Sequence, residues 1–250
     1  MKGKTMDFKE MLYKQLSADF NVSTENLKND GNIFILRKPN YERRLYKNDD
    51  CLLRILAINN KVVFNSTNAF FLERCKELFK DIEGEWISEF ATLLKLDVLL
   101  RKFNFSIAEG HQYYIPSDID NPVFNAAELR WFEGDELFRF YGDDDFSEAL
   151  AFDEMHPDMI AVTAIADEKI IGMAGASRDG KYMWQIGINV LPGYENRGIG
   201  TYLVYRLKCE IIKRGLLPFY GTGASHINSQ RVAFKAGFIP AFWELYTKIC

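Results

Sequence analysis

The sequence lacks several features that would assign it to a protein class at once. Only 4 of its 250 residues are cysteine, none of them stands in a CxxC pair, and its 3 histidines are far apart. This excludes zinc-ribbon, thioredoxin-type and helical His motifs. No run of about 18 apolar residues occurs, and the charged start MKGKTMDFKE has no apolar segment behind it. We therefore expect a cytoplasmic protein with no metal, no secretory signal and no membrane span.

An excess of basic residues is also missing. Lys and Arg number 31 against 35 Asp and Glu, giving a formal charge of -4. A protein that binds nucleic acid by neutralising phosphates is normally basic, so charge gives no support for a nucleic-acid partner. What the sequence does have is 48% hydrophobic residues. That fraction is enough for one domain core or two.

The first half predicts a small mixed α/β domain. Strand-like runs at 52–58 and 62–64 flank Asn59-Asn60-Lys61, which favours a tight hairpin because Asn tolerates positive φ. Two helical patterns follow. Their apolar positions are Phe71, Cys75 and Leu78 in the first, and Trp86, Phe90, Leu93 and Leu94 in the second.

The stretch IPSDIDNPVFNA, between Tyr114 and Ala126, has no periodicity and carries two prolines. Such composition is typical of a domain crossing. We place a boundary near residue 120, giving domains 1–120 and 121–250.

The second half predicts three successive strands at 159–166, 170–176 and 183–191. Short polar turns join them, so we expect an antiparallel meander. The third strand runs into PGYENRGIG, and a helix follows whose Ile199, Leu203, Leu207 and Ile211 share one face.

This order of strand, glycine-bearing loop and helix N-terminus is typical of an anion site, because free N–H groups of the first helical turn point at whatever lies before them. The spacing excludes two common versions. Gly198-x-Gly200 has no third glycine for a dinucleotide fingerprint, and this loop has no Gly-Lys pair followed by Ser or Thr as a P-loop needs.

The segment Val190-Leu191-Pro192-x-Tyr194-x-x-Arg197-Gly198-Ile199-Gly200-Thr201 resembles the pyrophosphate loop of the GNAT superfamily of acetyl-CoA-dependent N-acetyltransferases. The resemblance continues through a short strand at 218–222, a last helix at 229–238 ending in Gly-Phe, and a strand at 240–244 that completes the family's sheet. It covers residues 128–246. The whole chain is also similar to a group of two-part bacterial GNAT proteins of unassigned substrate.

The resemblance implies a mixed α/β fold. Its sheet is mainly antiparallel, splayed between its central strands and flanked by helices, and a smaller α/β domain precedes it. That domain is a candidate degenerate copy of the same fold, a hypothesis that rests on its hairpin-then-helix order.

The resemblance also implies where acetyl-CoA, the co-substrate, would bind. The backbone at Ile188 and Val190 would pair with the pantetheine arm. The implied contacts to the pyrophosphate and the rest of the molecule are Asn196, Arg197, Gly198, Ile199, Gly200, Thr201, Asn228 and Ser229.

Three positions depart from the family pattern. Glu195 replaces the usual Gln or Arg, His226 replaces the usual Asn, and Ala233 stands where many members have the tyrosine that protonates the departing thiolate. Tyr220 and His226 are therefore our candidates for acid or relay, with N–H donors near Val190 for the oxyanion. The alternative to an enzyme is a non-catalytic CoA-binding regulatory module, which these departures favour.

Charge is sorted along the second half. Eleven acidic residues against two basic ones lie between Glu128 and Asp158, while basic residues dominate after Lys169. One explanation is a solvated acidic face. The other is an acceptor cleft that concentrates cations, which predicts a cationic small-molecule amine bound by Asp153 and Glu154. The sequence leaves open the identity of the acceptor, and whether the first half caps the acceptor site or forms a homodimer.

Overall fold

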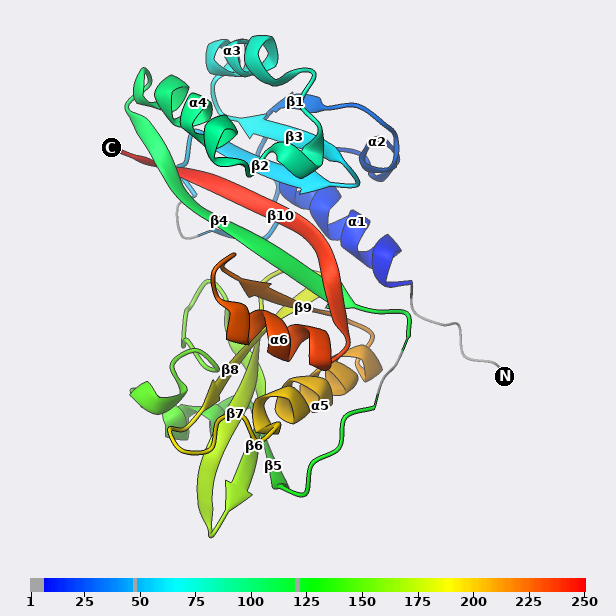
Figure 1. Cartoon of the computed structure of the whole chain (residues 1–250), viewed down its shortest axis with the longest axis vertical. Helices are drawn as coiled ribbons and strands as arrows, with labels where there is room; N and C mark the ends of the chain where they lie inside the picture. The colour runs from blue at the N-terminus through cyan, green and yellow to red at the C-terminus, as the bar shows by residue number, and fades with distance from the viewer. Residues whose placement is uncertain (1–6, 47–48, 120–121) are drawn as a thin grey trace. The chain divides into compact units, whose positions relative to one another are not determined.

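The computed structural model describes residues 7–46, 49–119 and 122–250, which form two compact units (Figure 1). Unit 1 comprises the described residues of Met1–Leu12 and Tyr114–Pro240. Unit 2 comprises those of Tyr13–Tyr113 and Ala241–Cys250. The expected boundary near residue 120 lies outside the described residues, and the division into 1–120 and 121–250 stays a prediction.

Unit 2 has the strand order β1-β3-β2-β10-β4. β2 pairs antiparallel with β3 and with β10, and β1 pairs parallel with β3. The elements with residues in this unit are α1 (Phe8–Phe20), α2 (Thr24–Lys28), β1 (Ile33–Leu36), β2 (Leu53–Ile58), β3 (Lys61–Ser66), α3 (Ala69–Phe79), η1 (Gly84–Trp86), α4 (Phe90–Arg101), β4 (Phe105–Pro116) and β10 (Phe238–Ile249).

The predicted hairpin of unit 2 is confirmed. Asn59 and Asn60 have φ of 48° and 57°, the left-handed pair that a two-residue turn between twisted strands requires. The second predicted helix begins later than its apolar pattern indicates. The backbone is extended at Glu89, with ψ of 138°, so α4 starts at Phe90 and Trp86 lies in the separate turn η1.

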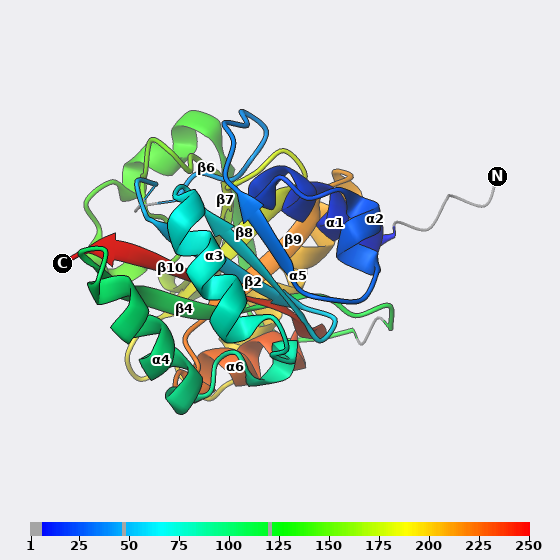
Figure 2. The ribbon, with the colours of Figure 1, turned by 90° about the horizontal axis from the view of Figure 1, so that it is seen from above.

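Helices α3 and α4 cover one side of the β1-β3-β2 strands, and α1 lies on the other side (Figure 2). Phe71 and Cys75 from α3 and Leu96 and Leu100 from α4 are fully buried in this core. The opposite side of the strands is more polar. There the amide of Asn65 donates to the carbonyl of Phe20 at the end of α1.

Unit 1 has the strand order β9-β8-β7-β6-β5. The predicted meander is confirmed, because β6 pairs antiparallel with β7 and β7 with β8. The elements are β5 (Glu128–Glu133), η2 (Gly134–Phe140), η3 (Asp144–Phe146), β6 (Asp158–Ala166), β7 (Lys169–Arg178), β8 (Met183–Val190), α5 (Ile199–Lys213), β9 (Leu217–Thr222) and α6 (Ile227–Lys235), with the adjoining ends of β4 and β10.

Two apolar clusters hold the sheet of unit 1. Leu203, Leu207 and Ile211 of α5 pack on one face with residues of α6. Phe140 and Phe146, from η2 and η3, belong to the second cluster with Met173 of β7. The helices and the η2–η3 segment thus enclose the central strands from two sides.

The central strands β8 and β9 separate after a short parallel pairing. Met183–Gln185 pair with Leu217–Phe219, and beyond Gln185 no further β8–β9 pair occurs in the described part of the chain. This is the splay that the resemblance implies. The fold is the expected mixed α/β class, with a mainly antiparallel sheet flanked by helices.

The strand expected at 240–244 forms as part of β10. Within β10, Trp243–Tyr246 pair antiparallel with Arg54–Ala57 of β2 in unit 2.

Candidate functional site

The glycine-bearing loop connects β8 to α5 through a series of tight turns. Gly193, Asn196 and Gly198 have φ of 86°, 61° and 78°, a conformation that glycine and asparagine adopt at least cost. The loop is joined to a neighbouring segment where the amide of Asn125 donates to the carbonyl of Arg197 at 3.2 Å. Its shape is therefore defined by the backbone.

The loop ends at the N-terminus of α5. Gly198 is the N-cap residue, and the first intrahelical hydrogen bond runs from the Tyr202 N–H to the Gly198 carbonyl. The N–H groups of Ile199, Gly200 and Thr201 precede it and have no acceptor within the helix. A Cβ at Gly198 would approach only the amide of Asn125, at 3.7 Å. A side-chain atom at Gly198 would therefore meet no close neighbour, and the helix dipole favours negative charge at this terminus.

Two charged side chains of the loop bind the loop itself. The Glu195 carboxylate accepts the N–H of Gly193 at 2.6 Å, and the Arg197 guanidinium donates to the carbonyl of Gly193 at 2.7 Å. The Arg197 guanidinium also lies 5.1 Å from the centre of the Tyr194 ring. The acidic replacement at Glu195 therefore stabilises the turn.

Strand β8 offers an unpaired edge next to this loop. Ile188 and Val190 pair with Ala174 and Gly172 of β7 on one side, while the pairing to β9 on the other has already ended at Gln185. Their side chains face α5, where a Cβ on Gly200 would lie 3.3 Å from Val190 and 3.7 Å from Ile188. An extended ligand could pair with the free edge as an added strand.

Tyr220 lies on β9 just beyond the point of separation. It is buried, and its hydroxyl is 2.8 Å from the hydroxyl of Ser229 on α6. Burial raises the pKa of Tyr220, the hydrogen bond with Ser229 lowers it, and the Glu148 carboxylate adds to the rise. The phenol is therefore held in its protonated form, able to donate.

Thr222 lies two residues after Tyr220 in β9, so the two side chains are on the same face of the strand. It is 5% exposed, and its hydroxyl has no hydrogen-bond partner among the residues described. Buried hydroxyls are rarely left unpaired in folded proteins. The Thr222 hydroxyl at the end of β9 can therefore form a hydrogen bond with a bound ligand.

Other expected site residues lie apart from Tyr220. His226 is the exposed N-cap residue of α6 and forms no side-chain cap bond, and Asn228 is exposed in the first turn. Ala233 is fully buried between α6 and the core. The structure therefore joins Tyr220 with Ser229, and it does not join Tyr220 with His226.

Asp153 and Glu154 lie in the loop before β6. Asp153 accepts the N–H of Met155 at 2.8 Å and contacts Nδ1 of His156 at 3.2 Å. Glu154 is exposed. Within the described ranges, no group of three or more His, Cys, Asp or Glu side chains could hold a metal ion.

Sequence reasoning missed two asparagines that shape the site. Asn125 ties down the loop at Arg197, and the Asn189 side chain accepts the N–H groups of Glu148 and Ala149 at 3.0 and 2.8 Å. Gly187 could have predicted the close contact of β8 with the Glu148 segment, since glycine inside a strand often marks a place where another backbone approaches closely. A Cβ at Gly187 would lie only 1.8 Å from the Glu148 carbonyl oxygen.

Comparison with known families identifies this arrangement. The model of the acetyltransferase (GNAT) family matches residues 126–238. Residues 126–238 form a GNAT domain. The match spans the β5–β9 sheet, the glycine-bearing loop and helices α5 and α6. The match gives the family of this segment, and no acceptor follows from it.

Several solved structures are similar to this chain. A GCN5-related N-acetyltransferase-like protein from Streptococcus suis is 10% identical, with 96% of this chain and 99% of that one covered and a TM-score of 0.49. A GCN5-related N-acetyltransferase from Kribbella flavida is 18% identical, with 61% and 62% covered and a TM-score of 0.43. The chain thus spans less than two thirds of the Kribbella protein. A search of curated proteins found no match. The family assignment rests on the family model.

No helix in the described part of the GNAT domain or of unit 2 is long and apolar enough to cross a membrane.

Proposed function

We propose that the protein transfers the acetyl group of acetyl-CoA to the amine of a cationic small molecule. The observation that carries this proposal is the open helix terminus at Gly198 beside the unpaired edge of β8. Phosphate and an extended pantetheine chain need these two features at one place. The binding residues that we assign are Ile188, Val190, Asn196, Arg197, Gly198, Ile199, Gly200, Thr201, Asn228 and Ser229.

The structure contains groups that fit such a ligand. The N–H groups of Ile199, Gly200 and Thr201 lack intrahelical acceptors, and Arg197 is exposed beside them. Thr222 has a buried hydroxyl without a partner in the described chain. Acetyl-CoA would supply a thioester, an activated acyl donor.

The residues of this chain would then act on the two reactants. The amine nitrogen forms a bond to the acetyl carbon while the carbon–sulfur bond breaks, and the nitrogen loses a proton to water or to the imidazole of His226. N–H donors near Val190 stabilise the negative charge on the carbonyl oxygen. Tyr220, whose phenol is protonated, donates the proton that the departing thiolate needs.

Charge supports a cationic acceptor. The segment from Glu128 to Asp158 carries eleven acidic and two basic residues, and Asp153 and Glu154 lie just before β6. A surface of one sign raises the local concentration of ligands of the other sign. We assign these two carboxylates to acceptor binding.

One observation favours the alternative of a non-catalytic CoA-binding module. Ala233 is buried at the position where many family members have a tyrosine that acts as general acid. The hydroxyl of Tyr220 already forms a hydrogen bond with Ser229. A module of this kind would bind acetyl-CoA without releasing CoA in the presence of an amine. Its ligand site would be the same.

The experiment that separates the two is a screen for CoA release from acetyl-CoA with simple amines, polyamines, aminoglycosides and peptide N-termini. The proposal predicts release with at least one cationic amine, reduced by Tyr220→Phe. Binding of acetyl-CoA with no release across the panel would support the module. If the protein neither binds acetyl-CoA nor releases CoA, both the acetyltransferase proposal and the module alternative are contradicted.

A further inference from the structure

Helix α4 of unit 2 has apolar residues on two of its sides. Leu96 and Leu100 are buried in the apolar core of the unit. On another side of the helix, Phe90 is 80% exposed, and Leu94 and Val98 are each 54% exposed. A helix that only covers a sheet needs one apolar side and normally has polar residues opposite it. The second apolar side of α4 is therefore not explained by the fold of unit 2.

The three exposed side chains form one continuous surface. Phe90, Leu94 and Val98 are spaced four residues apart, and residues at this spacing are neighbours on the surface of a helix. We call these three side chains the α4 face. Figures 1 and 2 show α4 at the periphery of unit 2. Trp86, which is 53% exposed in η1, precedes the face along the chain. A contiguous exposed apolar patch of this kind typically marks an interaction site.

The two ends of α4 carry opposite charge. Glu85 and Glu89 are exposed at its N-terminal end, and Arg101 and Lys102 are exposed at its C-terminal end. Arg101 lies within one turn of the last residue of the α4 face, and its Nε is 2.7 Å from the Asp97 carboxylate of the same helix. The α4 face is thus bordered by acidic residues at one end and by basic residues at the other.

This arrangement is complementary to itself. If two copies of α4 pack antiparallel about a twofold axis at Leu94, Phe90 of each copy meets Val98 of the other, and the two Leu94 side chains meet each other. The acidic end of each helix then lies opposite the basic end of the other. A parallel pair would instead bring like charges together, which is unfavourable. The charges therefore favour a second copy of this chain in the antiparallel orientation.

We propose that the α4 face is the interface of a homodimer, in which two α4 helices pack antiparallel about a twofold axis. A standard interface buries about 800 Å² on each partner, and about two thirds of a homodimer interface is apolar. An aromatic side chain has about 150–250 Å² to bury, so the exposed parts of Phe90 and Trp86 contribute roughly 200–330 Å². Leu94 and Val98 add to this area. The four side chains therefore provide more than half of the apolar area that such a dimer needs.

The mass of the protein in solution tests this proposal. Size-exclusion chromatography with light scattering should show a dimer for the wild type, with a dissociation constant in the micromolar range or tighter. Leu94→Glu places two carboxylates together at the twofold axis and should raise the dissociation constant at least about 100-fold. The matched control is Leu78→Glu, because Leu78 is 57% exposed on α3 and lies outside the α4 face. This control should stay a dimer.

Charge reversal tests the antiparallel orientation separately. Glu85→Lys with Glu89→Lys places basic residues against basic residues and should weaken the dimer at least about tenfold. Adding Arg101→Glu with Lys102→Glu restores opposite charges across the twofold axis, so the fourfold variant should return to within about threefold of the wild-type affinity. In a parallel dimer each residue would face its own copy, and the added substitutions would restore nothing.

Several results would overturn the proposal. They are a wild-type protein that stays monomeric at about 100 μM, a Leu94→Glu variant that stays a dimer, and a Leu78→Glu control that dissociates to the same degree. A fourfold variant that regains no affinity would also overturn it. Circular dichroism checks that each variant keeps its helices. If Leu94→Glu does not fold, the charge-reversal variants decide, because they leave the α4 face itself intact.

Discussion

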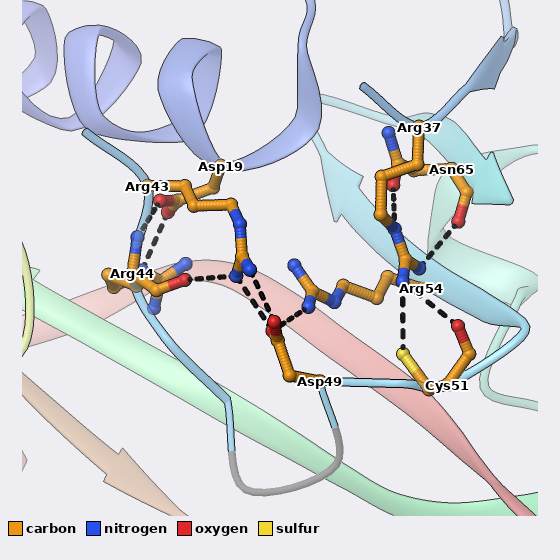
Figure 3. A network of polar contacts seen from close by, with 8 residues as sticks. All are labelled: Asp19, Arg37, Arg43, Arg44, Asp49, Cys51, Arg54 and Asn65. Atoms are coloured by element: carbon orange, nitrogen blue, oxygen red, sulfur yellow. Dashed lines mark hydrogen bonds and ion pairs between the residues drawn. The ribbon is translucent and has the colours of Figure 1, made fainter. Parts of the chain in front are cut away.

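The two units differ in what they bury. Unit 1 encloses its sheet in apolar clusters, and the charged residue that it buries, among the residues described, is Lys208 of α5. Unit 2 buries charge, because Asp19, Arg44, Arg54 and Glu244 are each at most 3% exposed. Figure 3 shows part of this network. The comparison teaches that unit 1 is stabilised mainly by apolar packing, whereas the buried charges of unit 2 contact one another.

Arg44 is the centre of the network in unit 2. Its Nε lies 2.6 Å from the Asp19 carboxylate, and its Nη2 bonds to Glu244. Burial opposes the charged form, but these two carboxylates outweigh it and hold the pKa of Arg44 well above its usual value. The second Glu244 oxygen has no partner among the described groups. Such buried pairs depend strongly on each member.

The largest expected effect is the loss of folding stability when this network is broken. Arg44→Met leaves Asp19 and Glu244 buried without a cation, and should lower the free energy of unfolding by about 3–5 kcal/mol. Urea denaturation measures it. The control Arg74→Met removes an exposed pair with Glu77 and should cost less than about 1 kcal/mol. Similar losses in both variants would show that the buried network is not what distinguishes unit 2.

The next effect concerns the loop of unit 1. Gly198→Glu or Gly200→Glu places a carboxylate where phosphate would meet the backbone, so acetyl-CoA affinity should fall at least about 100-fold in a folded protein. Gly215→Glu is the matched control, since Gly215 has φ of 80° and open space around it. Calorimetry on the three variants separates charge at the loop from backbone strain. Retained affinity in the Gly198 variant would refute the loop assignment.

A smaller effect is the pH dependence of unit 2. Burial raises the pKa of Glu244 to about 6, although the neighbouring Arg44 opposes this. The folded state therefore holds the proton more tightly than the unfolded state, and the stability that this gives is present below pH 4.5 and lost as pH rises through about 6. The loss should reach about 2 kcal/mol.

The measurement compares the stability of the wild type and of Glu244→Gln between pH 4.5 and 7. Their difference should change by that amount across the window, because Gln cannot titrate. A constant difference would mean that Glu244 has the same pKa in the folded and unfolded states.

The smallest expected effect is on the KM for the acceptor. Asp153→Asn with Glu154→Gln should raise the KM for a cationic amine severalfold at low salt, and the difference should shrink as salt screens it over about 8–10 Å. Asp81→Asn with Glu85→Gln, exposed acids of unit 2, should leave KM unchanged. An unaltered KM in the first variant, or a neutral best acceptor, would support a merely solvated acidic face.

Local signals predicted local structure well. The Asn59-Asn60 turn and the helix after Gly198 follow from backbone preferences within a few residues. Contacts between segments that are far apart in the sequence leave no local sequence pattern from which they could be predicted. Asp19, Arg44 and Glu244 come from a helix, an irregular segment and a strand, and their pairing depends on the route of β10 into unit 2.

The candidate site divides in the same way. The loop could be predicted because its residues are consecutive in the sequence. The Tyr220–Ser229 hydrogen bond and the hydrogen bond from the Glu148 N–H to Asn189 form only after folding. The assignment of Asp153 and Glu154 to acceptor binding, and of His226 to proton transfer, stays a prediction. Neither follows from backbone geometry.

The central claim is that the helix terminus at Gly198 and the open edge of β8 bind acetyl-CoA, and thermal unfolding with ligands tests it most directly. At about 100 times its dissociation constant a ligand stabilises the folded state by roughly 2.7 kcal/mol, so acetyl-CoA should clearly raise the melting temperature. ATP and NAD should do little. A rise with ATP or NAD and none with acetyl-CoA would contradict the account.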